Sequence, residues 1–415
     1  MEKYFSYKRR MLENGMEVYH IKTNSELFSL NLGVKIGSKY ESESEKGLTH
    51  FVEHMIFKGT EKRDNIKINE DIEELAGYSN AYTSYSDTVF KFMALNEEFE
   101  NAVEILSDLI RNPVFPEEEF KKEKDVILSE IKSDLDNIED YSYLRIEKEA
   151  FEKSFLAWDI AGDMDDVLRY SRDDIERYYR KYYNPDNSVI VIASSFSSDY
   201  VFSLIEKYFR DWEYRETRHP EVITEKNREK EYIIEKPDFE QSNILYLFTF
   251  GGLTRREELA LSVLSYSLGE NSNSHLFKRL REEKGMTYEV YSDFDVSKDV
   301  KTLYIYTALS KENLTHAKEI IEKTLSEVKE GKLVNEKSVR LMKKILKTSI
   351  ASALLDPQHI SDYVMGQIME DRDIYEFEDS LRTIESLKLD EIIEVGRKVF
   401  VNPTVQIIEG GEKNG

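Results

Sequence analysis

Apolar and polar residues alternate in two short stretches near the beginning of the chain, over residues 16–21 and 27–36. Alternation of this kind is typical of strands with one buried face. From residue 48 to residue 56 the pattern changes, and apolar residues recur every three or four positions between Gly47 and Gly59. This spacing predicts a helix that buries one side and ends at the second glycine.

Both kinds of pattern continue through the first half of the chain. Pro113 and Pro116 interrupt a long helical stretch, because the residue before a proline avoids the helical conformation. A continuous apolar run follows the turn at Asn184 and Pro185 and is typical of a buried strand. The expected elements are helices over 66–76, 97–112 and 117–136 and strands over 81–83, 88–95 and 188–193.

Residues 213–231 are almost wholly polar and are the best candidate for a linker. Beyond them the order of the first half returns, with a strand over 243–250, a helix, strands near 288–294 and 303–307, and long helices. The repeated order predicts two similar α/β halves of about 200 residues, a length suited to one domain. We therefore expect an N-terminal domain over 1–215, a linker over 216–230 and a C-terminal domain over 231–415.

The charge of the chain limits its partners. It has 58 Lys and Arg residues against 82 Asp and Glu residues, a formal net charge of −24. An acidic surface repels phosphate backbones and anionic lipids, so we expect neither a nucleic acid nor a membrane as partner. No stretch approaches the roughly 20 apolar residues of a membrane span. The N-terminus also lacks the apolar core of a signal peptide, which favours a cytoplasmic location.

The candidate metal ligands are histidines and carboxylates, because the chain has no cysteine. His50 and His54 are four residues apart on an expected helix, so both imidazoles share one face and can grip one tetrahedral zinc ion. Glu53 lies on the same side and can take a proton from a water whose pKa the zinc lowers towards ~7. This H-x-x-E-H order is the inverse of the commoner zinc-protease helix. The alternative is an exposed helix with two unrelated histidines.

A catalytic zinc needs three protein ligands, and the residue pattern alone leaves the third open. The helix expected over 117–136 carries several acidic residues. Glu130 lies among apolar neighbours, which places it at a possible core boundary. Glu123 is two turns earlier on the same stripe, where it can orient a site from behind its ligands. The alternative is a solvated acidic helix face.

The segment GLTHFVEHMIFKGT resembles the pitrilysin family of zinc metallopeptidases, which includes insulin-degrading enzyme and mitochondrial processing peptidase. Val52 stands where that family usually has leucine. The resemblance implies that the third zinc ligand is Glu130, within the segment EKDVILSEI, and that Glu123 is the supporting glutamate of the catalytic site. It implies one zinc ion per chain.

Two further segments carry the resemblance beyond the zinc motif. AGYSNAYTSYSDT resembles a stretch of the family that binds the substrate backbone, which gives this role to Asn80, Ala81 and Thr83, with Tyr78 in place of the second glycine usual there. LGENSNSHLFKRLREEKGMTYEVYS resembles the second-half signature, in which a substrate-binding Arg and Tyr fall on Arg281 and Tyr288. Without the resemblance, these two would be a solvated helix arginine and a half-buried strand tyrosine.

The resemblance spans residues ~10–410 and implies an architecture. The fold class is α+β, with two homologous domains, each a mostly antiparallel sheet covered by helices, that together form half of a clamshell. Two halves enclose a chamber for unfolded peptides. Because this chain carries both the zinc motif and the Arg/Tyr pair, the resemblance favours a homodimer in which Arg281 and Tyr288 of one chain face the zinc of the other. A heterodimer with a homologous chain is the alternative.

The expected function is that of a zinc-dependent metalloendopeptidase that hydrolyses short or unfolded peptides. Two alternatives stay open. The chain can be a non-catalytic partner or scaffold subunit of a heterodimeric peptidase, although such chains usually lose a ligand or the base. It can also be a dedicated peptidase that matures leader peptides.

Overall fold

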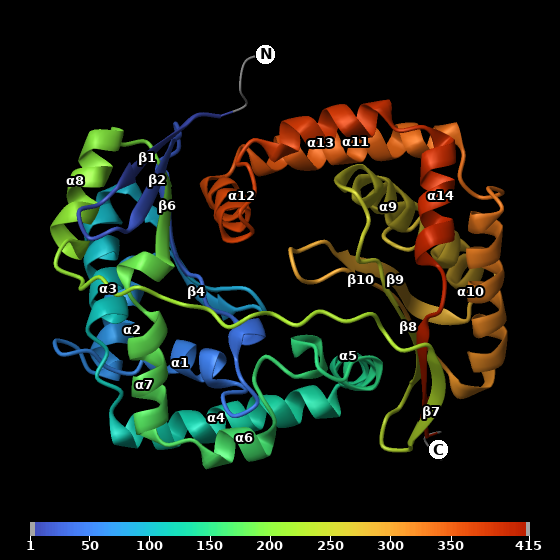
Figure 1. The fold of residues 1–415 in the computed structure, drawn as a ribbon, viewed down its shortest axis with the longest axis horizontal. Helices are drawn as coiled ribbons and strands as arrows, with labels where there is room; N and C mark the ends of the chain where they lie inside the picture. The colour runs from blue at the N-terminus through green and yellow to red at the C-terminus, as the bar shows by residue number, and fades with distance from the viewer. Residues whose placement is uncertain (1–4, 412–415) are drawn as a thin grey trace. The chain divides into compact units, whose positions relative to one another are not determined.

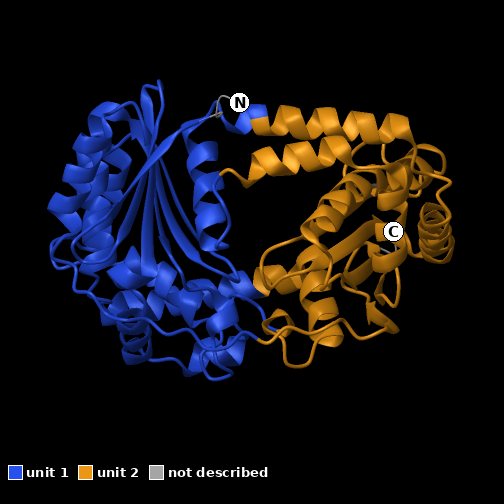
Figure 2. Cartoon of the chain, turned by 45° about the horizontal axis from the view of Figure 1, so that its top comes forward, with its two compact units in different colours: residues 1–131, 158–222, 351–374 blue, residues 132–157, 223–350, 375–415 orange. Residues whose placement is uncertain are grey.

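The computed structural model describes residues 5–411, with the side chain of Tyr288 left out. The chain forms two compact units, coloured separately in Figure 2. Unit 1 consists of residues 1–131, 158–222 and 351–374, and unit 2 consists of residues 132–157, 223–350 and 375–415. Both units are therefore discontinuous in sequence. Within the described part of the chain, no helix combines the length and the apolar character needed to cross a membrane.

Unit 1 contains a six-stranded sheet in the order β1-β2-β6-β3-β5-β4. All neighbouring strands are antiparallel except β2 and β6, which are parallel. The two central strands β6 and β3 are almost wholly buried, which explains their continuous apolar sequence. The strands are β1 (Tyr7–Met11), β2 (Glu17–Lys22), β3 (Leu27–Val34), β4 (Tyr78–Thr83), β5 (Thr88–Leu95) and β6 (Ser188–Ser194).

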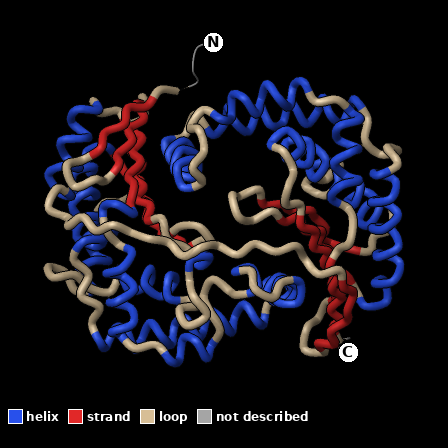
Figure 3. Tube along the Cα trace, in the orientation of Figure 1, coloured by secondary structure: helices blue, strands red, loops and turns tan. Residues whose placement is uncertain are grey.

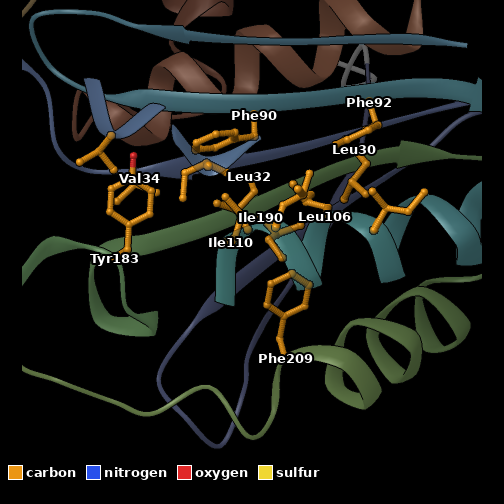
Figure 4. Close-up of a cluster of buried hydrophobic side chains, with 14 of the residues drawn as sticks. Leu30, Leu32, Val34, Phe90, Phe92, Leu106, Ile110, Tyr183, Ile190 and Phe209 are labelled. Atoms are coloured by element: carbon orange, nitrogen blue, oxygen red, sulfur yellow. The ribbon is translucent and has the colours of Figure 1, made fainter. Parts of the chain in front are cut away.

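Helices cover both faces of this sheet (Figures 1 and 3). The main core lies on the face covered by α3 and α8, where Leu30, Phe90 and Phe92 from the strands meet Leu106 and Ile110 from α3 (Figure 4). The helices of unit 1 are α1 (Leu48–Ile56), α2 (Asn65–Glu74), α3 (Phe99–Arg111), α4 (Glu117–Asp136, whose last turn belongs to unit 2), α6 (Met164–Arg169), α7 (Arg172–Tyr182), α8 (Ser198–Phe209) and α12 (Pro357–Met369).

Helix α12 packs on the opposite face, against β3 and β6. Polar contacts hold it there, since the Oγ atoms of Ser29 and Ser361 lie 2.6 Å apart and Asn31 Nδ2 donates to Asp362 Oδ1 at 2.7 Å. At Gly33 an added Cβ would lie 2.0 Å from Met369 Cε, so a larger residue there would require the flexible side chain of Met369 to move. The sequence of β3 thus provides apolar side chains for one face and small polar ones for the other.

Unit 2 repeats this topology. Its five-stranded sheet has the order β7-β11-β8-β10-β9, and only β7 and β11 are parallel. This is the order of the unit 1 sheet without β1, and α5 packs on β8 and β11 as α12 packs on β3 and β6. The strands are β7 (Lys230–Lys236), β8 (Ser242–Thr249), β9 (Thr287–Asp295), β10 (Thr302–Leu309) and β11 (Thr404–Gly410).

The predicted fold class is confirmed: the chain is α+β and has two similar halves with mostly antiparallel sheets. Residues 213–229, in the predicted polar linker, form no helix or strand. The helices of unit 2 are α5 (Ile138–Ala150), α9 (Arg255–Leu268), the π-helical turn η5 (Phe277–Glu282), α10 (Leu314–Lys329), α11 (Glu336–Ala353, whose last residues belong to unit 1), α13 (Glu376–Ser386) and α14 (Leu389–Val399).

Candidate metal centre

Helix α1 holds the two histidines of the sequence motif one turn apart. The rings of His50 and His54 have their centroids 4.5 Å from each other at an interplanar angle of 62°. On the other side of the helix Phe51, Val52 and Met55 are fully buried in the core of unit 1. Burial of this apolar side fixes the rotation of α1, so both imidazoles face away from the core.

The start of α1 is fixed as well. The buried carboxylate of Glu41 accepts the backbone N–H of Gly47 at 2.9 Å and of Thr49 at 2.7 Å, two donors that would otherwise lack a helical acceptor. Gly47 has φ +82°, and an added Cβ would lie 2.3 Å from the carbonyl oxygen of Ala161. Glycine is therefore required at this position.

Glu130 of α4 joins the two histidines. One ligand atom from each of His50, His54 and Glu130 lies within 4.8 Å of the others, and His54 Nε2 is 3.5 Å from Glu130 Oε2. Helix α4 reaches this position because its apolar side packs against α1, with the rings of Phe120 and Phe51 stacked at 5.2 Å. Two imidazoles and one carboxylate at this separation suit a tetrahedral zinc ion with one open position.

Glu123, two turns earlier on α4, contacts His54 from behind. Its Oε2 is 3.2 Å from Nδ1 of His54, and its Oε1 is 2.8 Å from Nζ of Lys58. Burial raises the pKa of Glu123, but the hydrogen bond to His54 and the contact with Lys58 lower it by more, so the side chain is ionised. The ionised carboxylate of Glu123 accepts a hydrogen bond from Nδ1–H of His54 and so keeps the proton on Nδ1. The lone pair of Nε2 then points towards the side of Glu130, where it is available to a metal ion.

The electrostatics of the two imidazoles differ. Burial, followed by the charge of His54, lowers the pKa of His50 to about 3, and among the described residues its buried Nδ1 has no hydrogen-bond partner. Burial also lowers the pKa of His54, but the hydrogen bond to Glu123 and the charge of Glu130 raise it by more. His50 is therefore neutral and has a buried nitrogen without a partner, as expected of a metal ligand. The carboxylates around His54 favour a positive charge at that position, which a metal ion would supply.

Glu53 lies next to this cluster and outside it. Its side chain is buried, and Thr83 Oγ1 donates to its Oε2 at 2.9 Å. Burial raises the pKa of Glu53 above the usual value, and the charge of Glu130 acts in the same direction, whereas the hydrogen bond from Thr83 opposes it. A carboxylate with a raised pKa is suited to accept a proton.

The other predicted site residues fall in two places. Asn80 and Ala81 lie on β4, the edge strand that supplies Thr83, where Asn80 is exposed and Ala81 is half-buried. Arg281 and Tyr288 belong to unit 2. Arg281 is exposed in η5, with its guanidinium 5.0 Å from the ring centroid of Phe277. Tyr288 lies in β9 beside an irregularity in the pairing with β10, and its side chain is outside the described structure.

Lys58 and Glu41 were not predicted as part of the centre, and Thr83 was expected only on the strand that binds the substrate backbone. Lys58 pairs with Glu123, and its position four residues after His54 was the available signal. Thr83 contacts Glu53, and the signal was the alternation of side chains along its strand. The role of Glu41 could not be predicted from the sequence, because its hydrogen bonds to the start of α1 depend on the conformation of the loop between them.

The combination of a histidine pair on one helix, a glutamate from a second helix and a buried carboxylate beside them is the class of site found in zinc-dependent peptidases. Comparisons with known proteins agree. The family described as Insulinase (Peptidase family M16) matches residues 18–163, and the family described as Peptidase M16 inactive domain matches residues 169–346. A Bacillus subtilis protein named as an uncharacterised zinc protease is 30% identical over 354 residues, which cover 83% of this chain and 85% of that protein.

The chain therefore belongs to peptidase family M16, and the predicted relationship to the pitrilysin family is confirmed. The beta subunit of human mitochondrial-processing peptidase is 32% identical over 200 residues, 48% of this chain and 41% of that subunit. Among solved structures, a protease from Helicobacter pylori has a TM-score of 0.90 at 21% identity and covers 98% of this chain and 99% of its own. At that identity the likeness establishes the two-domain fold.

Proposed function

We propose that this protein is a zinc-dependent metalloendopeptidase that hydrolyses short or unfolded peptides. The observation that carries the proposal is the meeting of His50, His54 and Glu130 within 4.8 Å, with the buried carboxylate of Glu53 beside them. Membership of a peptidase family and relatives named as zinc proteases support it. A cytoplasmic location stays a prediction.

In this proposal His50, His54 and Glu130 hold one zinc ion per chain. A zinc ion held there would supply a Lewis acid that makes a water easier to deprotonate and polarises a carbonyl. Glu53 accepts the proton of the attacking water and passes it to the amine that leaves. Glu123 and Lys58 hold the ring of His54 in position, and Thr83 holds the carboxylate of Glu53.

The substrate is proposed to add as a strand to the edge of β4. Within residues 5–411 this strand pairs with β5 alone, so its other edge has backbone groups available to a peptide. The backbone of Asn80 and Ala81 lies two to three residues from Thr83, which touches Glu53. Peptide addition at this edge would therefore bring a carbonyl close to the base. An extended backbone is required, which favours unfolded peptides over folded proteins.

The proposed assembly is a homodimer in which Arg281 and Tyr288 of the partner chain bind substrate at the zinc of the first. The chain carries both sets of residues, which supports identical partners over a heterodimer with a homologous chain. The beta subunit of mitochondrial-processing peptidase is named as one subunit of an assembly, which keeps the heterodimer and leader-peptide maturation as alternatives. A non-catalytic role is disfavoured because His50, Glu53, His54 and Glu130 are all retained.

The decisive experiment replaces Glu53 with glutamine. Glu53→Gln should bind zinc as the wild-type protein does and should lower kcat on an unfolded peptide by about 10³-fold or more, because the proton acceptor is lost. Zinc content is measured by elemental analysis and turnover by mass spectrometry of digests, with and without a chelator.

Glu61→Gln is the matched control, because Glu61 is exposed in the loop after α1 and its substitution should change neither quantity. Full activity of Glu53→Gln would refute the proposed mechanism. A wild-type protein that binds no stoichiometric zinc would instead favour the scaffold role.

A further inference from the structure

The two units differ in what covers one side of their sheets. In unit 1, α8 follows β6 and packs on α3 and β2. Unit 2 has matching elements, since β7 takes the place of β2 in the strand order, β11 that of β6, and α10 that of α3. Among residues 5–411, however, no helix follows β11. The place that α8 fills in unit 1 therefore has no matching helix in the described part of unit 2.

A cavity of about 470 Å³ lies at this place, lined by β7, β8, β11 and α10. We call it the α10 cavity. Its floor is aromatic, because the rings of Tyr246 and Phe248 stack with their centroids 6.3 Å apart and Phe400 meets Phe248 edge-on at 5.5 Å. The volume falls within the range of small-molecule sites, roughly 300–1,000 Å³.

Tyr246 brings a polar group to this floor. Its side chain is 1% exposed, and among the described residues its hydroxyl has no hydrogen-bond partner. Burial raises the pKa of Tyr246, and the charges of Glu322 and Glu231 act in the same direction, so the hydroxyl keeps its proton. A buried hydroxyl without a partner costs stability, and phenylalanine would avoid that cost. A ligand that bonds to the hydroxyl accounts for a tyrosine at this position.

The face of α10 towards the cavity carries opposite charges at its two ends. Glu322 and Lys329 are seven residues apart, which is two turns and about 10 Å along a helix. Lys318 is shared by Glu322 at 3.0 Å and Glu231 of β7 at 3.1 Å, so these two carboxylates have one negative charge in excess. Lys329 Nζ contacts the carbonyl oxygen of Phe400 at 3.3 Å and, within the described part of the chain, forms no ion pair.

The other two charged residues of the lining, Glu229 and Lys230, have opposite signs. A ligand that matches the cavity therefore needs a cationic end, an anionic end about 10 Å away and apolar groups between them. An extended peptide spans ~3.3–3.6 Å per residue, so about three residues separate its ammonium and carboxylate groups by this distance. A free amino acid is too short to reach both ends of the face. A peptide carbonyl can accept a hydrogen bond from the hydroxyl of Tyr246.

We propose that the α10 cavity binds short peptides of about three residues by both of their charged ends. Glu322 and Glu231 hold the terminal ammonium group, Lys329 holds the terminal carboxylate, and Tyr246 donates to a backbone carbonyl between them. An apolar side chain of the peptide packs on the aromatic floor. The cavity lies in unit 2 and performs no chemistry, and peptide binding there does not depend on the proposed function.

Calorimetric titration with the tripeptide Ala-Phe-Ala tests the site. The protein is the full chain with zinc and the substitution Glu53→Gln, so that the proposed peptidase does not consume the probe. Ala-Phe-Ala should bind saturably. Acetylation of its ammonium group, or amidation of its carboxylate, should each weaken binding about tenfold or more, because each removes a charge-assisted hydrogen bond.

Substitutions on α10 then assign each end of the peptide. In a Glu322→Gln chain the free and the acetylated peptide should differ by less than about twofold, and in a Lys329→Met chain the acid and the amide should do so. Glu319→Gln and Lys323→Met are the matched controls, because both residues are exposed on α10 outside the cavity lining. Both controls should keep the full dependence on each end.

Tyr246→Phe separates ligand binding from packing. It should weaken binding of Ala-Phe-Ala, yet the melting temperature of the free protein should stay the same or rise, because an unsatisfied buried hydroxyl is removed. A protein that does not bind Ala-Phe-Ala, or that keeps its dependence on both peptide ends in the Glu322→Gln and Lys329→Met chains, overturns the proposal. Hydrolysis of peptides by the wild-type protein is measured separately, so its absence would refute the peptidase and leave this site standing.

Discussion

His54 has a different acidic neighbour at each ring nitrogen. Glu123 contacts Nδ1 at 3.2 Å, and Glu130 lies 3.5 Å from Nε2. The two glutamates come from the same helix seven residues apart, yet only Glu130 shares the cluster with His50. In the proposed site the same residue type therefore has two roles, set by which nitrogen each carboxylate reaches: Glu123 would orient the ring, and Glu130 would be a zinc ligand.

Glu123→Ala should weaken zinc binding about 10–100-fold, because the ring of His54 loses the acceptor that fixes its tautomer and orientation. Competition with a chromophoric chelator measures the affinity. Glu118→Ala, an exposed position on the same helix, is the control and should bind zinc as tightly as the wild type. Equal affinity in both variants would show that Glu123 does not support the metal ligands.

At the residue scale the sequence predicts which side chains lie together when they belong to the same helix. The spacing of four between His50 and His54 places both rings together whatever the rest of the chain does. Glu130 is different, because its approach depends on how α4 packs on α1 through Phe51 and Phe120. That packing cannot be read from local spacing, and only the family resemblance selected Glu130. The assigned roles of all these residues stay predictions.

At the scale of elements, His20 joins three parts of the unit 1 fold. It lies on β2, with its Nδ1 2.8 Å from Ser198 Oγ on α8 and its Nε2 3.1 Å from Ser194 Oγ on β6. Burial, together with the charge of Lys22, lowers the pKa of His20 to about 4. The ring is thus neutral and bonded between two hydroxyls at neutral pH.

The lowered pKa of His20 predicts a loss of stability in acid. Below the unfolded pKa of about 6.5 the unfolded chain takes up a proton that the folded chain refuses until about pH 4. The contribution of His20 to the free energy of unfolding should therefore fall as the pH drops from about 6.5 to about 4 and should be constant above that range. His20→Asn removes this contribution, so its destabilising effect should be smaller at pH 5 than at pH 7 in thermal unfolding.

His316→Asn, at an exposed position of α10, is the control for the pH series, and its effect should be the same at both values. If the effect of His20→Asn did not depend on pH, burial would not be perturbing that histidine.

Most elements agree with the pattern of apolar positions. The helix expected from Gly47 to Gly59 is α1, and the strand expected over 243–250 is β8. Strand β7 was not anticipated, because it begins at the end of the polar stretch and is mostly exposed. It is held by parallel pairing with β11, more than 160 residues later in the sequence. Local periodicity carries no information about such a partner.

At the scale of the whole molecule, the two sheets share one strand order, yet their candidate functional residues are of different kinds. Unit 1 holds the histidine pair and its carboxylates, and unit 2 holds Arg281 and Tyr288. In the proposed homodimer each active site would combine the metal-binding residues of unit 1 from one chain with Arg281 and Tyr288 of unit 2 from the other chain.

Mixing two inactive variants tests that sharing. Equal amounts of Glu53→Gln and Arg281→Ala chains, exchanged into mixed dimers, should recover about a quarter of wild-type activity, because half of the dimers would carry one intact site of two. A mixture of Glu53→Gln with Glu130→Gln is the control and should stay inactive, since every site would keep one defect. If the first mixture is as inactive as its parents, the residues do not act across chains.

The placement of α12 has a consequence for how the protein is made. Residues 351–374 complete unit 1, but a ribosome reaches them only after it has added most of unit 2. At typical elongation rates of ~5–20 residues per second, roughly eight to thirty seconds separate residue 222 from residue 374. During this interval the face of β3 with Ser29, Asn31 and Gly33 has no helix to cover it, so the nascent first unit waits for a late segment of its own chain.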